Sequence, residues 1–194
     1  MRGLLKSALW SVFVGLLAGA GSASAADSYR LDSDRSHIQF TVQHHGFSIF
    51  EGEFQDFMGG FVFDWDDPSR SKIEVTIKTA SVDTNQSLVD NQLRSRDFLH
   101  VSVFPEITFK SREVRVIGTQ AGLIVGDLTV RGVTRPVALD VTLKEEVSRI
   151  KGYRETARFT ALGRVKRSDF GMDEAWPGFG DDIEIRIDLA AERH

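Results

Sequence analysis

One stretch decides the fold class of this 194-residue chain, and it reads His37-Ile38-Gln39-Phe40-Thr41-Val42-Gln43-His44. Apolar and polar side chains alternate in it with a period of two residues. Successive side chains of a β-strand point to opposite faces of the sheet, so the alternation predicts a strand with one dry face and one wet face.

The alternation recurs along the chain, in the ranges 61–65, 72–78, 137–144 and 183–189. Turn-forming residues separate the strands, at positions 66–69, 118–120 and 131–134. Many short strands with hairpin connections predict an all-β domain. The domain is either a sandwich filled by side chains or a closed up-and-down barrel of about eight strands that can hold a small ligand. Periodicity alone does not separate these two architectures.

The sharpest hairpin signal is Arg131-Gly132-Val133-Thr134, which joins residues 123–130 to residues 135–143. Gly132 can supply the positive φ that such a turn often needs, and Pro136 is expected to begin the second strand. One segment breaks the strand pattern. We expect a short helical segment near 85–99, capped by Asn85 and ending at about Ser95.

The N-terminus has the features of a secretory signal peptide. Arg2 and Lys6 precede an apolar stretch at 8–20, and Ala23-Ser24-Ala25 forms a small-residue cleavage site. The apolar stretch is shorter than the roughly 20 residues that span a bilayer. We therefore expect cleavage of residues 1–25, a periplasmic location, and one domain over residues 26–194.

Composition narrows the range of partners. The chain has 24 basic and 28 acidic residues, a formal charge of -4; without Arg2 and Lys6 the balance is 22 against 28, or -6. An acidic domain without a basic stripe argues against nucleic acid or an anionic membrane surface as the principal partner. The sequence has no cysteine, so burial and not disulfides must stabilise it. Its 14 phenylalanines suggest either a very full core or an apolar cavity wall.

Motifs for catalysis and metal binding are missing from the sequence. It has no cysteine nucleophile, no Gly-x-Ser-x-Gly and no His-Glu-x-x-His, so we expect no enzyme, no metal and no cofactor. His44 and His45 are adjacent, so on a strand they point to opposite faces and do not share an ion. A lipid-modifying enzyme would need an activated group inside the barrel, and His44 is the visible candidate.

Two short glycine-containing triplets resemble pieces of nucleotide-binding motifs, Asp169-Phe170-Gly171 and Gly178-Phe179-Gly180. Neither has the strand-to-helix context or the companion signatures that such motifs require. We interpret the first as a turn, with Phe170, Trp176 and Phe179 packed at one end of the domain.

An ordered set of segments resembles the YceI-like family, also called polyisoprenoid-binding proteins. The segments are 37–44, 46–48, 52–54, 77–85, 93–99, 104–109 and 126–137, and they span the mature chain. The resemblance implies a lipocalin-like antiparallel barrel with a long apolar pore, in a periplasmic protein that forms a homodimer. It also implies a bound polyisoprenoid, such as a quinone or polyprenyl lipid, with its tail inside and its head near the mouth.

Other functions remain open at this point. The pore would also accept a fatty acid or fatty amide, and a packed barrel without ligand would suit an interaction protein of the cell envelope. A transient contact with a membrane or membrane protein would accompany a lipid carrier. A solid core would use the same inward residues as a pore. The predicted ligand-binding residues are Phe40, Val42, His44, Phe61, Phe63, Val75, Ile77, Phe98, Phe109, Leu128, Val141, Phe159, Phe170 and Trp176.

Overall fold

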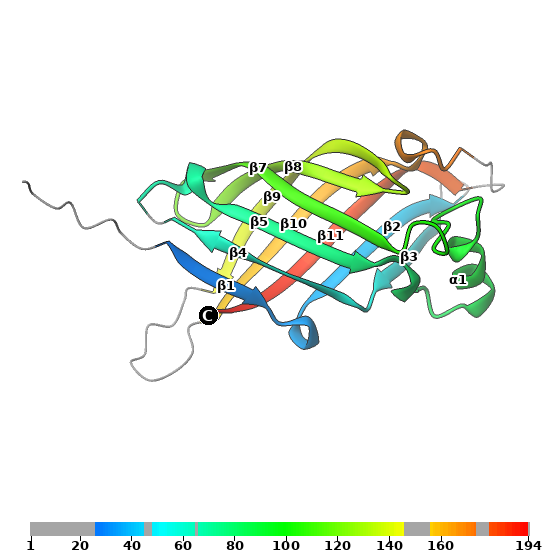
Figure 1. The fold of residues 1–194 in the computed structure, drawn as a ribbon, viewed down its shortest axis with the longest axis horizontal. Helices are drawn as coiled ribbons and strands as arrows, with labels where there is room; N and C mark the ends of the chain where they lie inside the picture. The colour runs from blue at the N-terminus through cyan, green and yellow to red at the C-terminus, as the bar shows by residue number, and fades with distance from the viewer. Residues whose placement is uncertain (1–25, 45–47, 65, 146–155, 174–178, 194) are drawn as a thin grey trace, which may run out of the picture.

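The fold is an antiparallel sheet that closes on itself, seen in a computed structural model that describes residues 26–44, 48–64, 66–145, 156–173 and 179–193 (Figure 1). The strand order is β1-β4-β5-β7-β8-β9-β10-β11-β2-β3-β6, and β1 also pairs with β11. The strands are β1 Asp27–Leu31, β2 His37–His44, β3 Ser48–Phe54, β4 Phe57–Phe63, β5 Lys72–Lys78, β6 Val82–Asp83, β7 Glu106–Ile117, β8 Ala121–Val130, β9 Val133–Glu145, β10 Thr156–Lys166 and β11 Phe179–Arg193.

Eight strands make up the barrel, because three of them are each interrupted. The 3₁₀ helix η1 (Ser33–Arg35) separates β1 from β2, residues 55–56 separate β3 from β4, and η3 (Thr79–Ser81) separates β5 from β6. Strand β11 pairs with β2 over most of its length and with β1 near its C-terminal end. The expected eight-stranded antiparallel barrel is thus confirmed.

The three interruptions lie side by side. The Gln55 N–H donates to the carbonyl of Ser81 over 3.2 Å, which joins the break after β3 to the break after β5. On the other side, the Ala190 N–H donates to the hydroxyl of Ser36 over 2.9 Å, where β11 changes partner from β2 to β1. The breaks therefore form one line across neighbouring strands.

The β8–β9 turn is tighter than the sequence analysis expected. Arg131 and Gly132 are its two central residues, with φ of 51° and 72°, which is the arrangement of a type I′ hairpin. Strand β9 already begins at Val133, so the expectation that Pro136 starts it is wrong. Pairing with β10 ends at Leu139, so Pro136 lies where that side of β9 is an edge and loses no ladder bond there.

The expected helical segment is present as α1 (Ser87–Arg94), but Asn85 does not cap it. Gln86 is the N-cap residue, without a side-chain cap bond, and Asn85 has a left-handed φ of 58°. The carboxylate of Asp90 instead accepts hydrogen bonds from the N–H (2.8 Å) and hydroxyl (2.6 Å) of Thr84. This buried carboxylate ties the helix to the end of β6. The rest of the predicted segment, 95–99, forms turns.

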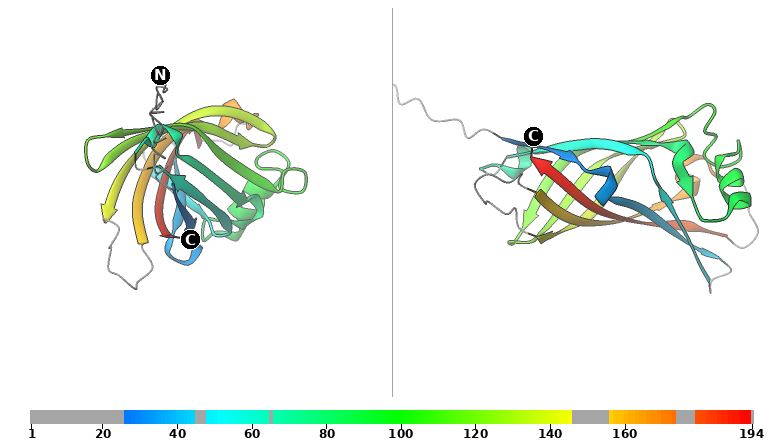
Figure 2. Two further views of the ribbon diagram at one scale, coloured as in Figure 1. Left: turned by 60° about the vertical axis from the view of Figure 1, so that its left-hand side comes forward. Right: turned by 90° about the horizontal axis from the view of Figure 1, so that it is seen from below.

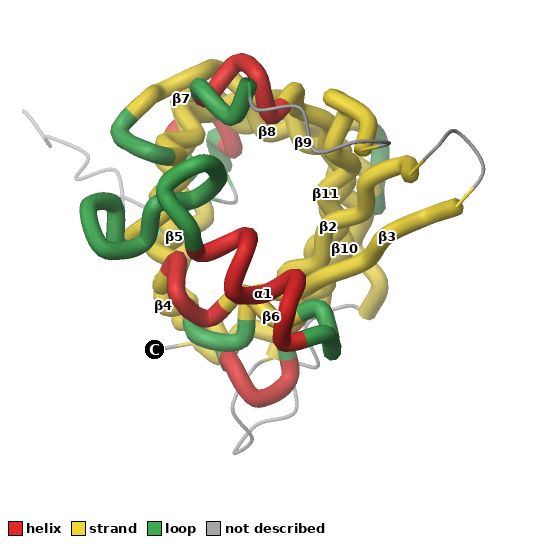
Figure 3. Tube along the Cα trace, turned by 90° about the vertical axis from the view of Figure 1, so that its right-hand side faces the viewer, coloured by secondary structure: helices red, strands yellow, loops and turns green. Residues whose placement is uncertain are grey.

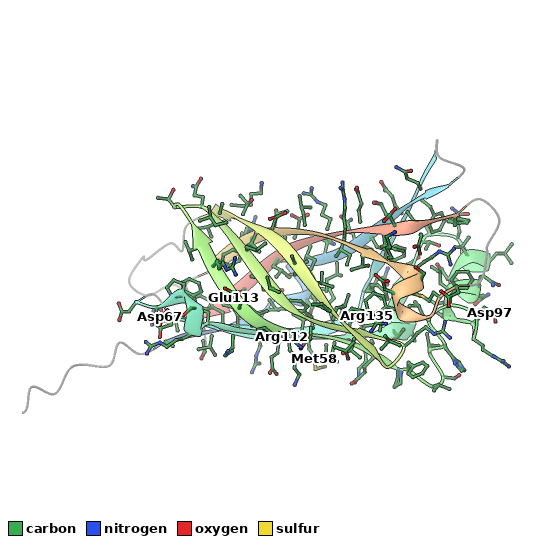
Figure 4. All side chains as sticks on the ribbon, turned by 90° about the horizontal axis from the view of Figure 1, so that it is seen from above. Met58, Asp67, Asp97, Arg112, Glu113 and Arg135 are labelled. Carbon is green, nitrogen blue, oxygen red and sulfur yellow. The ribbon has the colours of Figure 1, made fainter. Side chains whose placement is uncertain are left out.

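The two ends of the barrel differ. Helix α1, residues 95–105 and the 3₁₀ helix η4 (Arg167–Phe170) lie at one end, which we name the capped end (Figures 1 and 3). The end of β11, the β7–β8 turn and η2 (Pro68–Arg70) lie at the opposite end (Figure 2). Figure 4 labels Asp97 at the capped end and Asp67 at the opposite end. Among the described residues, no helix is long and apolar enough to cross a bilayer.

Candidate functional site

The interior of the barrel contains a cavity of about 380 Å³. Alternate residues of the strands point into it, so the apolar phase of each strand forms the wall. The middle of the wall includes Val75, Phe109, Leu139, Ala161 and Ile187. The sequence left open whether these residues fill a solid core or line a cavity. In the structure they pack against one another as a hydrophobic cluster and also line the cavity.

Twelve of the fourteen predicted ligand-binding residues line this cavity: Phe40, Val42, Phe61, Phe63, Val75, Ile77, Phe98, Phe109, Leu128, Val141, Phe159 and Phe170. For His44 the structure describes the backbone pairing with Phe179 and Ser48 and not the side chain. Trp176 lies outside the described residues. The role of all fourteen in ligand binding stays a prediction.

Small inward residues help to keep the interior open. On β10 the inward positions include Ala157, Ala161 and Gly163, and the first two are almost fully buried. Larger side chains from the neighbouring strands face them, such as Leu139, whose Cδ2 atom would be 2.6 Å from a Cβ at Gly163. The taper of a small barrel is commonly fitted by such a mixture of small and large residues.

Aromatic rings form the wall at the opposite end. Tyr29 stacks on Phe61 with ring centroids 4.6 Å apart, and Phe61 meets Phe159 edge to face at 5.7 Å. These are the offset and edge-on geometries that aromatic pairs favour. They give that end of the cavity broad, rigid apolar surfaces.

A second aromatic group lines the capped end. Phe40 and Phe54 have centroids 5.7 Å apart, and Phe50 meets Phe179 edge to face at 5.4 Å. Phe170 is 2% exposed and lies in the same region, in the turn predicted from its triplet. The sequence analysis missed Phe50 and Phe54, although their alternation with Glu51 and Glu53 was a usable signal.

Polar side chains line the cavity near its opposite end, where Arg115 lies close to Thr119 and Gln120. Arg115 is engaged by Glu113 through two hydrogen bonds of 2.5 and 2.9 Å. The hydrogen bond from Arg115 holds the pKa of Glu113 below its ordinary value, and the same bond raises the pKa of Arg115. The positive charge at this end is therefore already balanced by a carboxylate.

At the capped end the polar lining residue is Arg167. Its Nε donates to the carbonyl of Gly180 over 3.1 Å, and its Nη1 donates to the carbonyl of Met172. Asp181 lies beside it and accepts from the hydroxyl (2.7 Å) and N–H (3.0 Å) of Ser168, and these bonds hold the pKa of Asp181 below its ordinary value. Arg167 is thus oriented by backbone carbonyls, next to a carboxylate.

The described residues contain no group of three or more His, Asp or Glu side chains placed to hold a metal ion. In the triplet at 169–171, Asp169 and Phe170 form the end of η4. Gly171 follows η4 with a left-handed φ of 72°. This geometry is that of a left-handed glycine that ends a helical turn. The chemistry that the cavity offers is therefore apolar burial along its length, with polar groups near both ends.

Comparison with known proteins identifies relatives across nearly the whole chain. The family model described as YceI-like domain matches residues 29–191. Protein YceI from Escherichia coli O157:H7 is 43% identical over 186 residues, which cover 95% of this chain and 96% of that protein.

Solved structures share the same barrel. The Campylobacter jejuni YCEI protein superposes with a TM-score of 0.70 and 32% identity, covering 76% of this chain and 86% of that one. A polyisoprenoid binding domain from Saccharophagus degradans, implicated in plant cell wall breakdown, superposes with a TM-score of 0.61 over 86% of this chain and 98% of its own. Its identity is 14%, so the likeness concerns the fold.

Proposed function

Because the chain belongs to the YceI-like family, we propose that it binds a long-chain hydrophobic ligand, a polyisoprenoid such as a quinone or polyprenyl lipid, inside its barrel. The apolar cavity of about 380 Å³ is the observation that carries the proposal. Its size falls in the range of roughly 300–1,000 Å³ that is usual for ligand sites. The similarly folded polyisoprenoid binding domain from Saccharophagus degradans supports the ligand class.

The length of the barrel suits a chain-like ligand. Strand β11 has 15 residues. At about 3.4 Å per residue and a tilt of about 40° to the axis, a strand of that length extends roughly 40 Å along the barrel. Side chains from one end to the other line a single cavity. An extended tail therefore fits this interior better than a compact ligand does.

The energetics favour exchange with membranes over release into water. Burial of hydrocarbon stabilises a ligand by about 0.8 kcal/mol for each CH₂ relative to water. A tail that moves from a bilayer into an equally apolar cavity gains almost nothing by this measure. The protein would hence pick up and return a lipid at membranes, and its selectivity would come from cavity shape and polar contacts near the ends.

A neutral head group fits the polar lining best. Arg115 is balanced by Glu113, and Arg167 donates to two backbone carbonyls beside Asp181. A quinone or alcohol adds no charge to either place. A fatty acid is the second candidate, because both arginines line the cavity and a carboxylate would be attracted to them.

The remaining parts of the proposal concern the location of the protein, its oligomeric state and the fate of its ligand. The signal-peptide features of residues 1–25 support export to the periplasm, and these residues lie outside the described residues. We propose a homodimer that makes brief contact with a membrane or membrane protein. We further propose that the protein holds its ligand without transforming it, because the described residues that line the cavity are mainly apolar.

Native mass spectrometry of the mature protein, purified gently from an envelope fraction, tests the function. We expect a stoichiometric adduct, and extraction should identify it as an isoprenoid. A fatty chain in its place would keep the carrier function and replace the ligand class. Protein that is empty, and that also takes up no added isoprenoid or fatty acid, would overturn the proposal in favour of an interaction protein.

A further inference from the structure

One side chain joins three parts of the capped end. Arg131, in the β8–β9 turn, donates from Nη1 to the carbonyl of Gly171 over 2.7 Å and to that of Asp97 over 3.3 Å. Its Nη2 donates to the carbonyl of Arg96 over 3.2 Å. Positions 96 and 97 follow α1 and position 171 follows η4, so a single guanidinium holds both closing segments against a hairpin of the barrel wall.

The adjacent residue adds an apolar contact to the same junction. A Cβ at Gly132 would be 2.9 Å from the Cε1 atom of Phe104, so the turn lies directly against that ring. Phe104 in turn meets His100 edge to face, with centroids 5.8 Å apart. The β8–β9 turn thus seats the segment after α1 through polar and apolar contacts together.

Backbone strain is concentrated at this end. Within the described ranges, the non-glycine residues with positive φ are Asn85 (58°), just before α1, His100 (49°), in the segment after α1, and Arg131 (51°), in the β8–β9 turn. Side chains disfavour this conformation, and residues held in it tend to cluster at ligand clamps and switch regions. The capped end therefore contains strained backbone, which distinguishes it from the regular strands of the wall.

The cap closes the cavity without a strand ladder. Leu93, Phe98 and Phe170 line the cavity from its inner side, while Leu88 is 87% exposed on its outer side. Beside it, β3 pairs with β6 through positions 53 and 54 alone in the described chain, and the β2–β3 hairpin extends away from the ring (Figure 3). Besides Arg131, the cap is tied to the wall by the Thr79 N–H, which donates to the carbonyl of Pro105 over 2.9 Å, by Arg94, which donates to the carbonyls of Ala80 and Val82, and by Asp90. Segments held by separate bonds of this kind open at lower free energy than the core of a sheet.

We propose that α1, residues 95–105 and η4 form a cap that opens to pass the ligand, and that Arg131 is the latch that sets its rate of opening. The inference rests on the proposed function. Opening must break the hydrogen bonds to Gly171, Asp97 and Arg96 at one time, because all three come from one side chain. Arg131 does not line the cavity, so it acts on exchange rates and leaves ligand contacts unchanged.

Stopped-flow fluorescence with the apolar fluorophore N-phenyl-1-naphthylamine tests the latch on the mature protein. Arg131→Gly removes the side chain and suits the positive φ, so the turn is kept. We expect both the association and dissociation rates to rise about tenfold, as for a gate that limits passage, with Kd unchanged within about twofold. Arg131→Lys keeps the charge but loses the planar guanidinium. Its rates should lie between those of wild type and those of Arg131→Gly.

Arg135→Ala is the matched control. Arg135 lies on the same hairpin (Figure 4), is exposed, and donates to the neighbouring carbonyl of Thr134. Within the described residues it forms no hydrogen bond with the cap. Its loss removes the same charge and should leave both rates at the wild-type value. Amide hydrogen exchange supplies a second measurement: Arg131→Gly should speed exchange at Leu99 and Val101 and leave β10 protected.

Wild-type rates in both Arg131 variants would overturn the proposal that Arg131 is a latch. An equal loss of protection in β10 would also overturn it, because this result indicates unfolding of the whole barrel. A changed Kd with unchanged rates would also overturn it, because Arg131 would then act on the bound state. These results differ from failure of the proposed function, in which wild-type protein binds neither the fluorophore nor lipid.

Discussion

The ring of Phe40 on β2 lies over Gly52, its direct partner on β3, so closely that a Cβ at position 52 would be 2.4 Å from the ring's Cζ atom. Both positions face the cavity side of the wall. The ring can therefore lie against the wall because Gly52, on the opposite strand, has no side chain. Any larger residue at position 52 must push the ring toward the interior.

Gly52→Val should reduce ligand capacity more than stability. The displaced ring would enter the cavity, so we expect affinity for a long-chain ligand to fall about tenfold, with a loss of roughly 1–3 kcal/mol in unfolding free energy, as is usual for overpacking. Glu51→Val places the same side chain on the exposed outer face and is the control. Fluorophore titration and urea unfolding measure the two quantities; equal affinity for wild type and Gly52→Val would contradict the prediction.

Ala161→Phe should block the middle of the cavity. Ala161 is 5% exposed and lines the interior, whereas its neighbour Leu162 is 48% exposed on the outer wall. We expect Ala161→Phe to lose the lipid adduct in native mass spectrometry, because a ring at this position occupies the path of the tail. Leu162→Phe should retain the adduct. A folded Ala161→Phe protein with a full complement of lipid would show that the ligand lies elsewhere.

Glu113→Gln should shift head-group preference toward anions. Removal of this carboxylate takes away the ion-pair partner of Arg115, and both side chains are exposed. We therefore expect a gain of only about threefold in affinity for a fatty acid, reduced by salt, and no gain for a fatty alcohol. Glu184→Gln, which breaks the outer-wall pair with Arg164, is the control. A fatty-acid affinity unaffected by Glu113→Gln would place the carboxylate away from this end.

Stability should fall on acidification in part through Asp64. Its carboxylate accepts from the N–H groups of Asp67 (2.9 Å) and Asp66 (3.0 Å) and pairs with Arg70, and the bond from Asp67 holds the pKa of Asp64 below its ordinary value. A lowered folded pKa stabilises the fold above the unfolded pKa of about 4, and that contribution disappears as pH falls through the folded pKa.

The measurement is urea unfolding at a series of pH values from about 7 down to about 2. The Asp64→Asn variant should be less stable than wild type near neutral pH and should lose less stability on acidification. Its curve should approach that of wild type at low pH. Two parallel curves would show that Asp64 does not contribute to the acid response.

The strands were largely predictable from the sequence, because one dry face gives strict alternation. The closure of the barrel was not, since it depends on β11 leaving β2 for β1 at Ala190, a pairing between the two ends of the chain. Local propensity also failed at Asn85. Asparagine favours both N-caps and left-handed turns, and here the bonds from Thr84 to Asp90 select the second.

Most residues of the cavity wall could be predicted from the phase of the strands. The residues that this prediction missed have physical causes. Phe50 and Phe54 flank Gly52, and a glycine in a strand weakens the pattern that marks its neighbours. The contacts of Arg131 join positions 34 to 40 residues apart in the chain. No local pattern encodes such contacts, and the residue was visible in the sequence only as part of a turn.

The line of strand breaks described for η1, residues 55–56 and η3 divides the wall into two kinds of surface. Each of the five strands from β7 to β11 is a single long element, with local register shifts in the ladders, as between Ser111 and Glu113. In the other three strands the breaks lie next to one another and interrupt the ladder, so we expect the wall to bend there before it bends elsewhere. On the proposed function, a barrel that bends along one line would accept tails of unequal thickness without any change of sequence.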